Sequence, residues 1–146
     1  MASRTLHRLS AGIALSLMSQ TAVPMHLPEG IRAYEAENFD TAYTIFSSHA
    51  DRSNPRALYY LSLLYLSGKG VERDEFKAFK YCKMAAEEGM AEAQFQLGVM
   101  YLDGLGIMDD DEIKALEWLW KAADNGHQHA NELFDFILNR DFPIGC

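Results

Sequence analysis

The stretch that decides the fold is AQFQLGVMYLDGLGIMDDDEIKALEWLWKAADNG, residues 93–126. In its first half Ala93, Leu97 and Tyr101 recur every four residues, which is the spacing of one face of an α-helix. Two glycines interrupt this pattern, and a second set of helically spaced apolar residues then ends at Gly126, a typical helix stop. The stretch therefore predicts two helices folded back on each other.

The turn between these helices is predicted by Gly104 and Gly106, because glycine adopts a positive φ without steric cost. The run from Asp109 to Asp111 comes next, and the helix dipole favours carboxylates at the start of a helix. A single hairpin of this size cannot bury its own apolar stripe, so further copies are expected.

An earlier copy of the hairpin occupies residues 55–89. Up to the turn, matching residues lie 36 positions apart, in the pairs Ala57 and Ala93, Leu61 and Leu97, Tyr65 and Tyr101, Gly68 and Gly104, Gly70 and Gly106, and Val71 and Ile107. After the turn they lie 37 positions apart, in the pairs Lys77 and Lys114, Ala78 and Ala115, Tyr81 and Trp118, Ala85 and Ala122, Ala86 and Ala123, and Gly89 and Gly126. The extra residue falls in the acidic run, which predicts a surface loop there.

Two partial copies flank the full ones. Residues 30–51 have helical spacing on both sides of a short break, with Asp40 or Thr41 as the expected cap of the second helix, and predict a degenerate N-terminal hairpin. Residues 128–140 begin like a third copy but lack the glycine turn. They predict a lone C-terminal capping helix, followed by a tail at residues 141–146.

The repeated pattern resembles the Sel-1-like repeat family, relatives of the tetratricopeptide repeats. The resemblance rests on Ala-x3-Leu-(Gly/Ser)-x2-Tyr-x2-Gly-x-Gly and Lys-Ala-x2-(Trp/Tyr)-x3-Ala-Ala-x2-Gly, and it covers residues 55–89 and 91–126 in full. Ser62 replaces the usual glycine, and Met84 replaces the usual lysine. The resemblance implies an all-α, right-handed α/α solenoid of antiparallel helix pairs over residues 30–140. It also implies an adaptor or scaffold for other proteins rather than an enzyme.

In tetratricopeptide arrays the first helix of each pair lines a concave groove. Carried over to this chain, that geometry implies a partner-binding groove formed by Arg56, Tyr59, Leu63, Glu92, Phe95, Val99 and Phe136. Tyr59, Leu63, Phe95 and Val99 lie outside the repeat-defining core positions, so they are candidates for contact with a partner peptide or helix. The alternative is that they complete the core or lie under the N-terminal segment. Tyr65, Tyr81, Tyr101 and Trp118 are expected to fill the space between stacked hairpins.

The N-terminal residues 1–23 differ from the rest. They combine Arg4 and Arg8 with a short apolar run and then small residues, which is the layout of a secretory signal peptide. A mitochondrial presequence, or the amphipathic helix or tail of a cytoplasmic protein, remains an alternative. Residues 24–29 are predicted to be a linker because they contain two prolines. We expect an exported protein, either periplasmic or secreted.

The composition describes a folded, acidic chain. Its 146 residues are 49% hydrophobic and carry a formal net charge of −8, and the first 26 contain no acidic residue. An acidic surface repels phosphate backbones and anionic lipid headgroups. The apolar run of the leader is also too short to cross a bilayer. We therefore expect protein partners, no nucleic acid, and no stable membrane span once the leader is removed.

The chain shows no sequence pattern for chemistry. It has no Cys-x-x-Cys, zinc-spaced Cys/His cluster, phosphate loop or catalytic triad pattern, so no metal, cofactor or catalytic residue is predicted. Cys82 lies beside Lys80 and Lys83, which favours a lowered thiol pKa, although a packed helix residue is the preferred interpretation. A disulfide between Cys82 and Cys146 stays open. So do two other functions: a small hydrolase or enzyme inhibitor in the cell envelope, and a structural assembly factor of an envelope or secretion complex.

Overall fold

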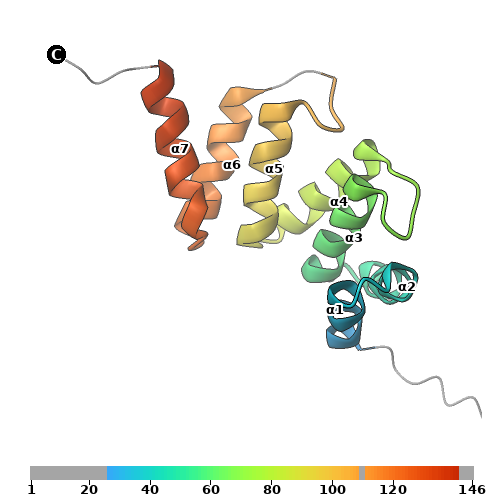
Figure 1. The fold of residues 1–146 in the computed structure, drawn as a ribbon. Helices are drawn as coiled ribbons and strands as arrows, with labels where there is room; N and C mark the ends of the chain where they lie inside the picture. Colours follow the sequence, from blue (N-terminus) through green and yellow to red (C-terminus); the bar gives the residue numbers. More distant parts are fainter. Residues whose placement is uncertain (1–25, 109–110, 142–146) are drawn as a thin grey trace, which may run out of the picture.

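The computed structural model of the chain describes residues 26–108 and 111–141. Over these residues it consists of seven α-helices joined by short turns, with no strand (Figure 1). The helices are α1 (Leu27–Glu35), α2 (Phe39–Ala50), α3 (Pro55–Ser67), α4 (Glu75–Glu87), α5 (Ala91–Asp103), α6 (Glu112–Asp124) and α7 (Gln128–Asp141). The predicted all-α fold is confirmed. The predicted leader at residues 1–23 lies outside the described residues, as do residues 142–146 of the tail.

The helices form a curved row of hairpins. Each helix packs against its neighbours in sequence, so α1 and α2, α3 and α4, and α5 and α6 make three successive pairs. Figure 1 shows the row running from the α1/α2 pair at one end to the single helix α7 at the other. A row of this kind buries a continuous core only between neighbouring units.

The turns inside the two full hairpins have the same chemistry. Helices α3 and α5 end at glycines in the left-handed conformation, Gly68 and Gly104, with φ of 67° and 66°. The second helices begin at Asp74 and Asp111, whose side chains accept the backbone N–H of the third residue of the helix at 2.9 and 3.0 Å. The extra residue therefore leaves the frame of the hairpin unchanged. Asp109 and Asp110, where it falls, lie outside the described residues.

Glycines in the turns also join one hairpin to the next. A Cβ atom on Gly106 would lie 2.2 Å from the carbonyl oxygen of Glu75, at the start of α4. A Cβ atom on Gly70 would lie 2.8 Å from the carbonyl oxygen of Phe39, at the start of α2. Each turn thus rests on the second helix of the preceding hairpin. Because α2 is contacted as α4 is, the α1/α2 pair packs as a member of the array.

The N-terminal hairpin differs in detail from its prediction. Helix α1 begins at Leu27, so the last part of the predicted linker at residues 24–29 is helical. Pro28 lies in the first turn of α1, where its missing N–H has no helical partner to lose. The cap of α2 is Asn38, which accepts the Thr41 backbone N–H at 3.4 Å, instead of Asp40 or Thr41. The helix starts at Phe39, two residues before the Thr41 start that its apolar spacing indicated.

Two adjoining clusters form the core. One lies between α2 and α3, and the other extends from α3 to α6. Fully buried alanines in both clusters allow helix backbones to approach closely. Tyr65 and Tyr101 fill the space between hairpins as expected, each only 8% exposed. Tyr81 and Trp118 are half-buried and pack at the edge of the core, so they fill this space only in part. The Lys121 Nζ lies 4.2 Å from the Trp118 ring centroid.

Candidate functional site

Six of the seven predicted groove residues lie on the first helices of the two full hairpins. Helix α3 carries Arg56, Tyr59 and Leu63, and α5 carries Glu92, Phe95 and Val99 at the equivalent positions. Their spacing of three and four residues places each set on one side of its helix. Arg56 and Glu92 are exposed, and the four apolar side chains are half-buried. We call the surface formed by these six residues the first-helix face.

The two charged residues of the first-helix face lie near one another. Arg56 and Glu92 line one open hollow of about 320 Å³, whose floor includes Leu27, Pro55 and Met90. Glu92 also borders a second hollow of about 580 Å³ between the starts of α5 and α7. The face therefore offers one cationic and one anionic group beside apolar surface.

Tyr59 is anchored in the protein rather than free in a groove. Its ring packs against the core, and burial raises the pKa of its hydroxyl to about 12, with smaller contributions from Cys82 and Glu92. The phenol is therefore neutral at physiological pH and able to donate a hydrogen bond. The alternative prediction, in which the apolar residues complete the core, holds in part for this residue.

Sequence reasoning missed Tyr60, the next residue on α3. Its ring stacks on Phe46 with a centroid distance of 4.7 Å and lies edge-on to Tyr34 and Tyr59, at 5.1 and 5.8 Å. These contacts extend aromatic surface from α3 towards the N-terminal hairpin. Tyr60 has Gln96 as its counterpart in the second copy, so repeat matching gave no signal for it.

His127, just before α7, was missed as a neighbour of the groove. Its ring stacks on Phe95 with a centroid distance of 4.2 Å and an angle of 13°. Burial lowers the pKa of His127, although Glu92 opposes the shift, so the ring is neutral near pH 7. The spacing of the repeats could have revealed this packing. His127 lies 37 residues after Met90 and so occupies the equivalent position, and Met90 packs on the core.

Phe136 is placed apart from the other six residues. It lies on α7 with 65% of its surface exposed, and no ring contact or hollow among the described residues joins it to α3 or α5. It remains a predicted contact residue on the neighbouring unit.

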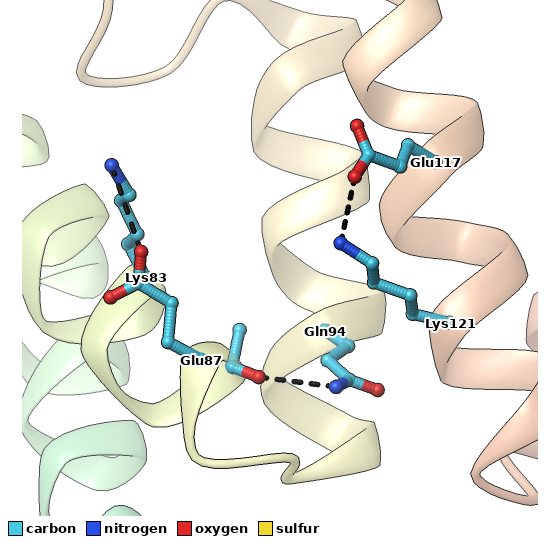
Figure 2. Close-up of polar contacts among 6 residues, drawn as sticks. Lys83, Glu87, Gln94, Glu117 and Lys121 are labelled. Carbon is cyan, nitrogen blue, oxygen red and sulfur yellow. Dashed lines mark hydrogen bonds and ion pairs between the residues drawn. The ribbon is translucent and has the colours of Figure 1, made fainter.

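A buried amide fixes the spacing of the units that carry the face. Gln94 is 4% exposed and donates from Nε2 to the carbonyl oxygen of Ala86 at 3.1 Å, reaching from α5 back to the end of α4 (Figure 2). Its Oε1 accepts from the Asn125 Nδ2 at 2.8 Å. One side chain therefore links α4, α5 and the end of α6. This link holds the first-helix face in one shape.

Both full hairpins match a known protein family. The model of the Sel1 repeat matches residues 55–90 and 91–127. The chain belongs to the Sel1 repeat family. The solved structure of a Sel1 repeat protein from Oxalobacter formigenes is 32% identical, superposes with a TM-score of 0.74, and covers 79% of this chain and 45% of its own. The solenoid expected from the sequence is thereby confirmed.

Two curated proteins are among those similar to this Sel1 repeat chain. The chitin synthase regulator SKT5 of Saccharomyces cerevisiae is 32% identical over 128 residues, covering 80% of this chain and 18% of that protein. The ERAD-associated E3 ubiquitin-protein ligase component HRD3A of Arabidopsis thaliana is 35% identical over 72 residues, covering 49% of this chain and 10% of that protein. The chain spans less than a fifth of the length of either relative.

The Sel1 array offers little for chemistry in the part of the chain described. Cys82 is fully buried and its thiol donates to the Ala93 carbonyl oxygen at 3.3 Å. The preferred interpretation of Cys82 as a packed helix residue is therefore confirmed. Burial raises its pKa to about 12, so the lowering that the two nearby lysines would favour does not occur. Residues 26–108 and 111–141 contain no group of three His, Cys, Asp or Glu side chains placed to hold a metal ion. Cys146 lies outside these residues, so the disulfide stays untested.

The acidic run and the helix lengths complete the description. Asp111 caps α6, and Glu112 pairs with Arg140 of α7 at 2.8 Å, as helix-start carboxylates rather than as a cation loop. None of the helices described is both long and apolar enough to pass through a bilayer.

Proposed function

We propose that this chain is a protein-interaction adaptor that binds a peptide segment or helix of a partner along its first-helix face. Sel1 repeat proteins generally bind other proteins. The observation that supports this particular face is the pairing of half-buried apolar residues at equal positions of successive units, Leu63 with Val99 and Tyr59 with Phe95. A helix or an extended peptide presents its side chains at a regular spacing, so it can contact such regularly spaced apolar residues one by one.

The chemistry of the face describes the partner segment. Arg56 and Glu92 lie beside the apolar residues and expose their charges. A segment with apolar anchors, an acidic residue near Arg56 and a basic residue near Glu92 would match it. The neutral Tyr59 hydroxyl supplies a further polar contact.

The proposal is tested by capture of partners from the native source with Leu63→Ser and Val99→Ser combined. These changes remove apolar contact area at two half-buried positions, and we expect binding to weaken about tenfold or more. Met108→Ser, which changes a methionine that is 99% exposed in the turn before α6, is the matched control. Unchanged capture by a double variant with wild-type circular dichroism would reject the groove, and equal loss with Met108→Ser would place binding elsewhere.

We also propose that the chain is exported, on the sequence of residues 1–23 alone. N-terminal sequencing of the protein from its native source tests this directly. A mature chain that starts near residue 24 agrees with export, and one that keeps the leader contradicts removal of a signal peptide.

A further inference from the structure

Apart from Met108 in the turn before α6, the exposed large apolar side chains of the full hairpins lie on their second helices, away from the first-helix face. Phe76 of α4 is 71% exposed, and Ile113 and Trp120 of α6 are 82% and 57% exposed. Phe76 and Ile113 lie 37 residues apart and occupy the same position in the two units. The exposed apolar surface is therefore repeated.

These residues belong to a stripe on each helix that is exposed along its whole length. Positions four, seven and eleven residues after Phe76 and after Ile113 are also exposed, which is the spacing of one helix face. The outer stripe consists of Phe76, Lys80, Lys83 and Glu87 on α4, and of Ile113, Glu117, Trp120 and Asp124 on α6. The equivalent positions of α2 are polar: Asp40, Thr44, Ser47 and Asp51. The outer stripe is therefore particular to two helices.

The two halves of the outer stripe differ in charge: the α4 half carries two lysines and one glutamate, and the α6 half carries two carboxylates. On α4, Phe76 and Phe79 line an open hollow of about 340 Å³ together with Lys80, Lys83 and Met84. On α6 the corresponding positions carry Glu117 and Asp124 around Trp120, and Glu117 is paired with Lys121 of the same helix at 2.7 Å (Figure 2). Lys80 makes no ion pair within residues 26–108 and 111–141. Lys83 has only a long contact of 3.8 Å with Glu87 (Figure 2). Lys80 and Lys83 are thus available to an acidic partner surface.

We propose that the outer stripe is covered by a second copy of this chain, with α4 of each copy on α6 of the other. A two-fold contact of this kind places equivalent positions of α4 and α6 opposite one another. The layers pair Phe76 with Ile113, Lys80 with Glu117, and Lys83 with the ring of Trp120. The pairing occurs twice, because the contact is symmetric.

The last layer of this arrangement is unfavourable and gives a sharp test. It places Glu87 against Asp124 of the second copy, two like charges at the rim of the contact. Replacing Asp124 with lysine changes this repulsion into attraction. Asp124→Lys is therefore expected to tighten the dimer, whereas most surface changes in an interface weaken it.

Sedimentation equilibrium of the full chain tests the proposal. We expect a concentration-dependent mass that rises from 16.5 kDa towards twice that value. Lys80→Glu and Glu117→Lys should each raise the dissociation constant about tenfold or more, the two combined in one chain should largely restore it, and Asp124→Lys should lower it. Arg52→Glu, an exposed reversal in the turn after α2, is the control and should have no effect.

A wild-type chain that stays at 16.5 kDa at the highest soluble concentration would overturn the proposal. So would a dimer that is insensitive to both reversals, or one that the combined variant fails to restore. Each of these results would show that a second copy of the chain does not cover the outer stripe in the proposed way. Loss of the dimer in Lys80→Glu or Glu117→Lys, with partner capture left intact, would separate this contact from the first-helix face.

Discussion

Single glycines join the units of this protein, and Gly106 is the clearest case. It has φ of 75° and lies so close to Glu75 and Phe79 that a Cβ atom would overlap both. Gly126 has a similar φ of 86°, but a Cβ atom added there would meet nothing within 4 Å. Substitutions at these two glycines therefore separate the cost of a left-handed backbone from the cost of disturbing the contact between hairpins.

We predict that Gly106→Ala destabilises the protein more than Gly126→Ala. Both changes force a non-glycine residue into the left-handed region, at a cost of roughly 1 to 2 kcal/mol. Only Gly106→Ala also overpacks the contact with α4, which adds roughly 1 to 3 kcal/mol. Urea denaturation measures both free energies of unfolding. Equal losses in the two variants would show that the turn does not rest on α4.

Residue chemistry was partly readable from the sequence. The turn glycines and the buried alanines were predicted because they recur at a fixed offset and have one physical reason each. Asn38 was missed as the cap of α2, because several polar residues at that junction satisfy the same rule. Cys82 was correctly predicted to be a packed helix residue, whereas the two lysines beside it indicated a pKa shift in the wrong direction, because neighbours in sequence reveal charge but not burial.

At the scale of elements, the docking of α7 depends on one neutral ring. His127 precedes α7 and stacks on Phe95 of α5, and its pKa is lowered from 6.5 chiefly by burial. The unfolded chain therefore binds the proton more readily than the folded chain. This contribution to stability is complete above about pH 6.5 and is lost as the pH falls below that value.

We predict that acidification loosens α7 and that His127→Phe removes this sensitivity. Phenylalanine keeps an aromatic ring on Phe95 but cannot take up a proton. Thermal midpoints at about pH 7.5 and pH 5.5 should differ less in His127→Phe than in the wild type. His26→Gln is the control, since His26 is exposed before α1, at the other end of the array. A pH response unchanged by His127→Phe would contradict this role.

Helix positions were predicted well because apolar periodicity reflects the side that is buried. The same periodicity did not reveal the outer stripe. Phe76, Ile113 and Trp120 follow helical spacing like core residues, and only the packing shows them to be exposed. Trp118 matches Tyr81 in burial as well as in position, because both rings are half-buried at the edge of the core.

At the scale of the whole molecule, the chain presents two surfaces on a stack that Gln94 and the turn glycines make rigid. The first-helix face carries paired apolar anchors beside two charges, and the outer stripe carries complementary charges on α4 and α6. An adaptor with both surfaces in use would hold two partner segments in one dimer. Avidity would then exceed the affinity of either face alone.

Site-specific photo-crosslinking tests the central claim, binding at the first-helix face, most directly. A benzophenone side chain is placed at Val99 in one variant and at Trp120 in another, and both are irradiated in the native source. The account predicts that position 99 forms adducts with a heterologous protein and that position 120 forms adducts with a second copy of the chain. Adducts with the heterologous partner from position 120, and none from position 99, would contradict it.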